Sequence, residues 1–308
     1  MRTDDLRGGT NRTGIPLSAF AMPDGLAMRY DLPHISLRET VSGYATYAAR
    51  NRAEMINWFL PAPPMICVLV DAGPVSITLR QHRFNVGKVS LYGPTSRAFK
   101  ATTNGGIQVG VGLTALGWIR LVPLSSSAFH NRVLPLGAVM SDALSDRLLN
   151  SLVALADERE LAATLDAILT PLFADEHPYD DIVRRFTGLM LVDGVIEIAD
   201  AADRLGLPSA TLRRIATYAF GMPPKLLLRR ARFLRSFIGL LSSGEMQTYD
   251  RIDSSYHDAS HFLRDANDFL GTTPRRLMAQ GTTFMTASLV ARAAALGAPA
   301  HALHARTP

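Results

Sequence analysis

The sequence has a single cysteine, Cys67, among its 308 residues. One thiol can form neither an intrachain disulfide framework nor a thiolate metal cluster, and such low usage is typical of a reducing compartment. Apolar runs of eighteen or more residues are also missing, as is the apolar segment of a signal peptide after Met1. We therefore expect a soluble, cytoplasmic protein without a membrane partner.

Clustered metal ligands are also missing from the histidine pattern. No His-x-x-x-His or Glu-x-x-His grouping links the scattered residues His34, His82, His130 and His177. His257 and His261 stand four apart, but both fall in a stretch that has another explanation below. We expect no metal site.

Catalytic and cofactor motifs are equally scarce. Val109-Gly-Val-Gly112 lacks the third glycine of a dinucleotide fingerprint, and it is more typical of a closely packed strand. Ser125-Ser-Ser127 lacks the flanking glycines of a hydrolase nucleophile elbow. The sequence therefore predicts a protein that is not an enzyme and needs no cofactor.

The chain has enough apolar material for two globular domains, with 47% hydrophobic and 19% charged residues. Its formal charge is +5 and its isoelectric point is about 9.6. Such a balance is compatible with an acidic partner such as nucleic acid, although charge speaks to association and not to fold.

Local composition divides the chain into four parts. Residues 1–35 are rich in Gly, Pro, Arg and Asp, which predicts an irregular extension. Residues 36–177 combine short strands with later helices and suggest a sensor or assembly domain. Residues 178–282 are helical, and 283–308 form a helical or disordered tail. The predicted fold class is α+β.

Short β-branched and apolar runs dominate the first half, and turn residues separate them. With no helices between them, they predict an antiparallel barrel or sandwich. Asn104-Gly105 is expected to form a hairpin turn, because both residues tolerate positive φ. The runs are 44–47, 55–59, 65–70, 75–79, 86–92 and 107–113.

Four apolar residues from different runs could line a ligand cavity or simply fill the core. They are Trp58, Phe59, Met65 and Tyr92. Core packing is the ordinary role of aromatics on strands. After Trp118 the pattern changes to helices, with Ser141 as a cap before leucines at helical spacing and a second helix from Leu161 to Phe173.

A helix-turn-helix pattern follows the boundary at His177-Pro178. Apolar residues at helical spacing lead to Gly206, which can end a helix in the left-handed conformation. Pro208 and Ser209 can start and cap the next helix, whose apolar spacing resumes at Leu212. The second helix of such a unit can enter a major groove.

Basic residues accumulate around and after this unit. No Asp or Glu interrupts the stretch from Arg204 to Arg235. A stripe of one sign is the electrostatic footprint of a DNA-binding surface. It contains Arg213, Arg214, Lys225, Arg229, Arg230, Arg232 and Arg235.

A second unit completes the pattern. Gly221-Met-Pro-Pro-Lys225 closes the first unit, a helix from Pro224 to Leu241 follows, and Gly271-Thr-Thr-Pro274 closes the second. Together with Tyr256-His-Asp-Ala-Ser-His-Phe-Leu-Arg264, these segments resemble the AraC/XylS family of bacterial transcription regulators. The resemblance covers about a third of the chain.

The resemblance implies a sequence-specific regulator that binds promoter DNA through two helix-turn-helix units joined by one long helix. It allows a small-molecule effector, contact with RNA polymerase and a homodimer. The residues assigned to DNA are Ser209, Ala210, Arg213, Arg214, Thr217, Lys225, Ala259, Ser260, His261, Arg264, Arg275 and Arg276.

The two units differ in the residues they offer. The first has Arg213 and Arg214, whereas the second has Ala259 beside Asp258 and Asp265, whose carboxylates would repel phosphates. We therefore expect the first unit to supply most base discrimination. The alternative function is an enzyme or ligand-binding barrel whose C-terminal helices support only folding or oligomerisation.

Overall fold

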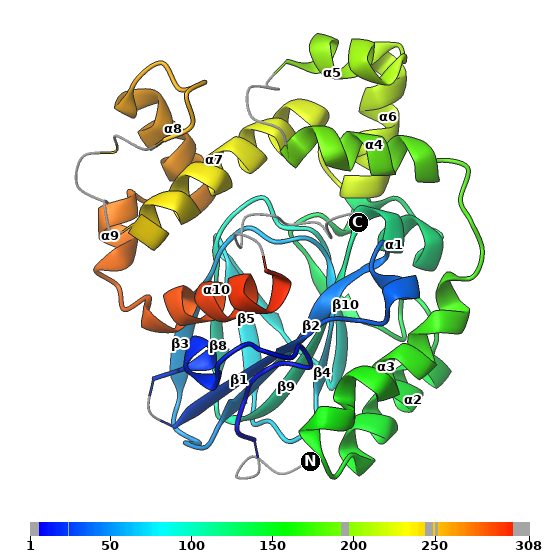
Figure 1. The fold of residues 1–308 in the computed structure, drawn as a ribbon, viewed down its shortest axis with the longest axis vertical. Coiled ribbons are helices and arrows are strands. Elements are labelled where there is room, and N and C mark those ends of the chain that lie inside the picture. Colours follow the sequence, from blue (N-terminus) through cyan, green and yellow to red (C-terminus); the bar gives the residue numbers. More distant parts are fainter. Residues whose placement is uncertain (1–5, 24, 192–196, 244–248, 250–251, 298–308) are drawn as a thin grey trace.

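The computed structural model describes residues 6–23, 25–191, 197–243, 249 and 252–297. Two antiparallel sheets come first in the chain and a group of helices follows, which confirms the expected α+β class. Figure 1 shows most of the C-terminal helices gathered at one end of the sheets, with α7 spanning that end.

The larger sheet has six strands in the order β1-β2-β9-β4-β7-β10. The strands are β1 (Leu26–Asp31), β2 (Val41–Ala49), β4 (Met65–Leu69), β7 (Val89–Tyr92), β9 (Gly106–Leu113) and β10 (Val133–Pro135). The smaller sheet has the order β3-β8-β5-β6, with β3 (Met55–Phe59), β5 (Val75–Leu79), β6 (His82–Asn85) and β8 (Phe99–Thr103).

The two faces of the larger sheet have different surroundings, as the residues of β9 show. Ile107, Val109 and Val111 belong to the main core beneath the helices. Gly110 and Gly112 alternate with them and line a cavity on the other face. Because side chains alternate along a strand, the glycines leave that second face open.

Asn104-Gly105 does not form the expected hairpin. The backbone of Gly105 has φ +72°, so the positive-φ turn is present. However, β8 pairs with strands of the smaller sheet and β9 with strands of the larger sheet, so this turn crosses between sheets. A tight hairpin occurs instead at Arg80-Gln81, where Leu79 faces His82.

The extension over residues 1–35, expected to be mostly irregular, contains regular structure in its described part. β1 forms an edge of the larger sheet, Leu6 and Phe20 are buried, and a short helix covers Leu17–Phe20. Gly9 donates its backbone N–H to Met28 at 3.0 Å. Backbone pairing and a few apolar contacts order a segment whose composition resembles a tail.

Three helices follow the sheets: α1 (Ala115–Leu121), α2 (Asp142–Ala154) and α3 (Leu161–Leu169). The predicted cap is confirmed, since Ser141 Oγ accepts a hydrogen bond from the Leu144 N–H at 3.2 Å. The predicted helix up to Phe173 continues from α3 as a 3-10 turn over Thr170–Phe173. α2 packs against β4 and β7 on the outer face of the larger sheet.

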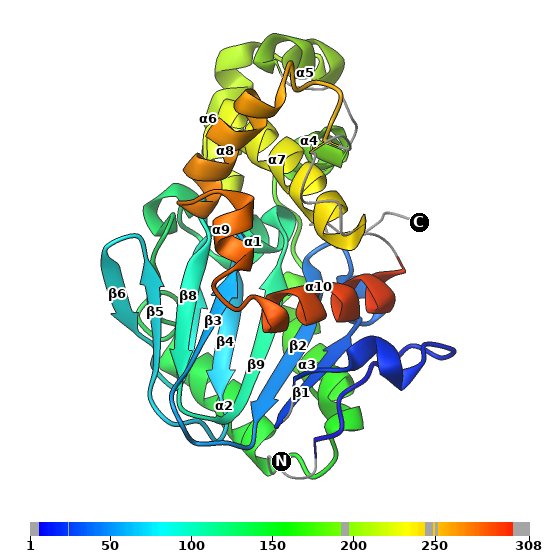
Figure 2. The same cartoon turned by 90° about the vertical axis from the view of Figure 1, so that its left-hand side faces the viewer.

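The remaining helices form the C-terminal half. They are α4 (Asp180–Leu191), α5 (Ile198–Leu205), α6 (Ser209–Phe220), α7 (Pro224–Ser243), α8 (Ala259–Leu270), α9 (Pro274–Met278) and α10 (Thr283–Leu296). The tail expected over 283–308 is a helix over the span of α10, which returns to cross the sheets (Figure 2). Residues 298–308 lie outside the described residues.

One apolar core runs through the β-rich half and the first part of the helical half. It extends from Tyr44 and Val109 to Phe186, Ile215 and Leu228. The ion pair between Arg184 Nε and Glu39 Oε1, at 2.8 Å, also joins the two halves. We retain the boundary at 177–178 as a proposal for the start of the helical domain; it falls in the connection before α4. Within the described chain, no helix is long and apolar enough to span a membrane.

Candidate nucleic-acid interface

The first helix-turn-helix unit consists of α5, the turn at Gly206 and α6. Gly206 has φ +68°, and its N–H donates to Asp203 O at 3.0 Å, while the Leu207 N–H donates to Ala202 O at 3.0 Å. This is the left-handed helix end that the sequence predicts. Ser209 is the first residue of α6, and no side-chain hydrogen bond caps that helix, so the expected Ser209 cap is wrong.

The outer face of α6 carries the residues assigned to DNA. Leu212, Ile215 and Ala216 are buried beneath it. Ser209 and Thr217 are half-buried at its two ends, and three residues of the set are exposed: Ala210, Arg213 and Arg214. α6 therefore exposes one polar face, and a major groove is wide enough to admit a helix.

The two arginines on this face have different surroundings. Arg214 donates from Nη1 to the Tyr179 hydroxyl, and its guanidinium lies 5.3 Å from the centre of that ring. Arg213 forms no hydrogen bond or ion pair with a described residue. Arg213 is therefore the more available of the two for a base edge, while Tyr179 orients Arg214.

The basic stripe of the joining helix is not a free surface. Arg229 Nη2 lies 2.8 Å from Asp268 Oδ2, and Arg235 Nη2 lies 2.8 Å from Asp253 Oδ2. Both arginines are thus paired with acids that follow α7 in the sequence. The expectation that these residues belong to a continuous DNA-binding stripe is wrong, because their partners lie outside the acid-free segment.

Arg230 is buried and faces the β-rich half. Its Nη1 donates to the Thr95 carbonyl at 2.7 Å, and Nε has no partner among the described residues. Burial lowers the pKa of Arg230 to about 10. Nearby, the Ala98 N–H donates to the Phe269 carbonyl at 2.7 Å. The loop of residues 94–98 thus contacts both α7 and the end of α8.

The second unit presents α8. Asp258 caps it, accepting a hydrogen bond from the His261 N–H at 2.7 Å. Ala259, Ser260 and Arg264 are exposed, and His261 is half-buried with its ring against Tyr256. The first helix of this unit would have to precede α8, where residues 244–248, 250 and 251 are outside the described part.

Asp265 is buried, whereas the sequence predicted a carboxylate on the outer face of α8. Its side chain is 1% exposed and accepts hydrogen bonds from Arg232 Nη2 and the Tyr256 hydroxyl, each at 2.8 Å. Burial would raise the pKa of Asp265, but the hydrogen bonds from Arg229, Arg232 and Tyr256 outweigh it, and the pKa lies below its ordinary value. This carboxylate therefore cannot repel phosphates from the outer face of α8.

The other assigned cations lie at helix starts. Lys225 is exposed in the first turn of α7. Arg275 and Arg276 are exposed on α9, where the Thr273 hydroxyl accepts a hydrogen bond from the Arg276 N–H at 3.4 Å. These positions suit contacts with phosphate more than with base edges.

Two residues near the interface were missed by the sequence reasoning. Asn267 is exposed one turn beyond Arg264, and helical spacing could have identified it. Tyr179 precedes α4 and positions Arg214, but nothing in its local sequence points to that contact.

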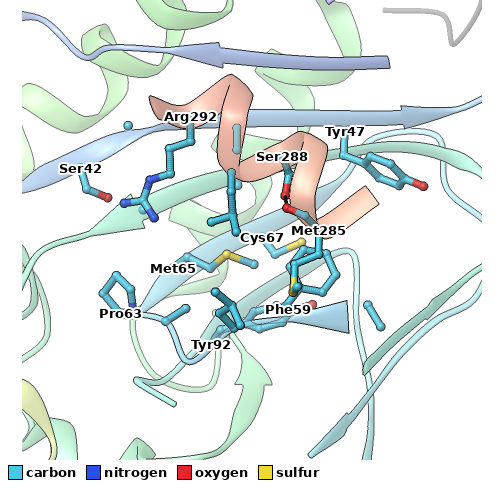
Figure 3. Close-up of a pocket in the computed structure, with 18 of the residues that line it drawn as sticks. Ser42, Tyr47, Phe59, Pro63, Met65, Cys67, Tyr92, Met285, Ser288 and Arg292 are labelled. Carbon is cyan, nitrogen blue, oxygen red and sulfur yellow. Dashed lines mark hydrogen bonds between the residues drawn. The ribbon is translucent and has the colours of Figure 1, made fainter. Parts of the chain in front are cut away.

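A cavity of about 250 Å³ lies between the two sheets, and Leu234 and Ile238 of α7 belong to its wall. Figure 3 shows α10 running across it. Phe59, Met65 and Tyr92 line it, whereas Trp58 packs against the core of α7 and α8. Cys67 also lines the cavity, and burial raises the pKa of its thiol to about 12, so it stays protonated. No group of three metal-ligand side chains occurs among the described residues.

No family model matches the sequence, and neither does any curated protein. Among solved structures, ToxT from Vibrio cholerae O395 matches with a TM-score of 0.41 and 13% identity, over 76% of this chain and 96% of that chain. A fatty acid-bound ToxT from strain SCE256 gives 0.41 and 13%, covering 76% and 94%. The AraC-like transcriptional activator CuxR gives 0.30 and 12%, covering 71% and 88%.

Proposed function

We propose that the chain is a sequence-specific DNA-binding transcription regulator of the AraC type. In this proposal α6 and α8 enter the major groove of promoter DNA, and α7 holds them in a fixed relation. The β-rich half serves as a sensor or assembly domain that tunes binding through a small-molecule ligand or self-association. The protein would act in the bacterial cytoplasm, where contact with RNA polymerase is a further element of the proposal.

The observation that carries the proposal is the contrast between α7 and the two helices beside it. The arginines of α7 are occupied by acids and carbonyls, whereas Arg213 on α6 and Arg264 on α8 are exposed. A helix needs free donors on one face to read base edges. The polar faces of α6 and α8 meet that need.

The first unit is expected to discriminate bases more strongly than the second. Arg213 can donate two hydrogen bonds to guanine, while the matching part of α8 begins with Ala259, which offers only a methyl group. Asp258, exposed beside Ala259, adds a negative charge near the DNA. Ser260, Arg264, Arg275 and Arg276 would then mainly hold the phosphate backbone.

The alternative is a ligand-binding protein, or an enzyme, whose helices only support folding or oligomerisation. The cavity between the sheets favours ligand binding but does not argue against a regulator, since α7 contributes Leu234 and Ile238 to its wall. The proposal therefore combines both features, with ligand binding in a regulatory role.

A gel-shift titration separates the two functions. The full chain is titrated against its own upstream region and against a scrambled duplex of equal length, at several salt concentrations. The proposal expects tighter binding to the upstream region and a logarithmic affinity that falls with salt. Equal binding to both duplexes at every salt concentration would sink it.

A further inference from the structure

Arg292 is the one charged residue among those that line the cavity between the sheets. It lies on α10, and in Figure 3 its side chain extends toward Ser42. Most of the rest of the wall is apolar or small, including Met28, Phe59 and Met65. A charged group that faces such a wall is costly unless a counter-charge accompanies it.

No described residue supplies that counter-charge. Arg292 forms no ion pair with a described acid, and its Nε is buried without a hydrogen-bond partner. The Tyr30 ring lies beneath the guanidinium, with its centre 5.9 Å away, but it cannot accept the N–H groups as a carboxylate would. The Tyr30 hydroxyl donates to the Ser42 carbonyl.

The part of β9 that lines the cavity runs from Gln108 to Gly112. Gly112 lies beside Ser42, toward which Arg292 extends, while Gln108 stands opposite Tyr47 on the neighbouring strand β2. The four residue steps from Gln108 to Gly112 span roughly 13 Å of strand. Gln108 Nε2 is buried and has no partner among the described residues.

We propose that this cavity binds an amphipathic monocarboxylate whose carboxylate pairs with Arg292 and whose apolar body lies along β9. The glycines of β9 provide the room. A Cβ on Gly110 would lie 3.7 Å from Met65 Sδ and Ala45 O, so a side chain there enters the cavity without a clash. Small inorganic anions do not fit this description, because they leave the apolar wall uncovered.

The ligand would touch the helix that joins the two recognition helices. Leu234 and Ile238 of α7 line the cavity, and α10 follows α9 after residues 279–282. Binding of the ligand would therefore affect how α6 and α8 are positioned relative to each other. This regulatory part rests on the proposed DNA-binding function, whereas the binding of the carboxylate does not.

Calorimetry on the full chain without DNA tests the site, with decanoate, decanol and inorganic phosphate as probes, below micelle-forming concentrations. Decanoate should bind more tightly than decanol, and phosphate should not bind. Arg292→Gln should weaken decanoate binding about tenfold or more, because a charge-assisted contact is lost, and should leave decanol binding in place. Arg292→Lys should restore part of the preference.

Two further variants complete the design. Gly110→Val should weaken decanoate and decanol together, because it fills the cavity without touching the cation. Arg147→Gln, on the exposed face of α2 and away from the cavity, should change neither. Retained decanol binding shows that Arg292→Gln is folded.

The site is refuted if decanoate binds no better than decanol, if neither binds, or if Arg292→Gln keeps the preference. The DNA titration with and without decanoate is read separately. Carboxylate binding without any DNA preference would overturn the proposed regulator and leave the site standing. DNA preference without carboxylate binding would overturn the proposed site and leave the proposed regulator standing.

Discussion

Nη2 of Arg232 on α7 lies 2.8 Å from Oδ2 of Asp265 on α8, and the two side chains are only 5% and 1% exposed. The Tyr256 ring stacks on the same guanidinium, with its centre 4.0 Å away, and its hydroxyl donates to Asp265. A basic residue of α7 and an acidic residue of α8 thus neutralise each other inside the protein. This pair fixes α8 on α7.

Asp265→Asn should destabilise the protein by about 3 kcal/mol or more, because it leaves the Arg232 guanidinium buried without its counter-charge. Asp268→Asn is the matched control. Asp268 is half exposed and forms its ion pair with Arg229, so its loss should cost about 1 kcal/mol or less. Urea unfolding of both variants measures the difference, and equal losses would contradict the structural role of Asp265.

Gly221→Ala and Gly271→Ala test how the first unit docks on the β-rich half. Gly221 ends α6 and Gly271 ends α8, each at φ +75°. A Cβ on Gly221 would meet Pro94 Cγ at 2.6 Å and Ser126 O at 2.9 Å, whereas one on Gly271 has nothing within 4 Å. Gly271→Ala should cost about 1 kcal/mol from backbone strain alone.

Gly221→Ala should cost about 1 to 3 kcal/mol more than Gly271→Ala, since overpacking adds to strain. Thermal or urea unfolding of the two variants side by side gives this difference. The same loss in both would mean that the loop at Pro94 does not hold the first unit.

His130 should make stability depend on pH. Burial, and then the positive charges of Arg230 and Arg80, lower the pKa of its imidazole below the ordinary 6.5. The unfolded chain therefore takes up a proton that the folded chain resists. The contribution of neutral His130 to the free energy of unfolding is therefore fully present above about pH 6.5. It is lost as the pH falls below that value.

His130→Gln should flatten the unfolding free energy between about pH 7 and 5, when measured against the wild type. His257→Gln is the control, because that side chain is 93% exposed. A wild-type profile that His130→Gln leaves unchanged would refute this assignment.

Arg213→Ala and Lys225→Ala should affect DNA binding in different ways. Arg213 is free to read a base, so its loss should relax preference at one operator position by roughly 1 to 3 kcal/mol. Lys225 should contact phosphate, so its loss should weaken all sequences about equally. Binding of both variants to single-base operator changes compares them, and identical sequence profiles would show that the roles are not divided.

Much of the helical half could be predicted because its signals are local. Gly206, Gly221 and Gly271 end helices in the left-handed conformation, and Ser141 caps α2 as expected. The strands at 55–59 and 75–79 also match their predicted spans, since β-branched runs and turns are read from neighbouring residues.

The failures share a physical cause, which is that partners distant in the sequence decide the outcome. The arginines of α7 form a stripe in the sequence, but Asp253, Asp265 and Asp268 neutralise three of them after folding. β1 is held by its pairing with β2, which composition does not reveal. Arg292 lines the cavity only because α10 returns across the sheets.

The most direct test of the central claim is a saturation-mutagenesis map of the operator, with binding of the full chain measured for every base change. We expect a strong preference in one half of the site and a weak one in a half about ten base pairs away, since joined recognition helices follow successive turns. Arg213→Ala should erase part of the strong half, and Ser260→Ala should alter neither pattern. Equally strong base preference in both halves of the operator would contradict the account. So would a loss of specificity in Ser260→Ala that matches the loss in Arg213→Ala.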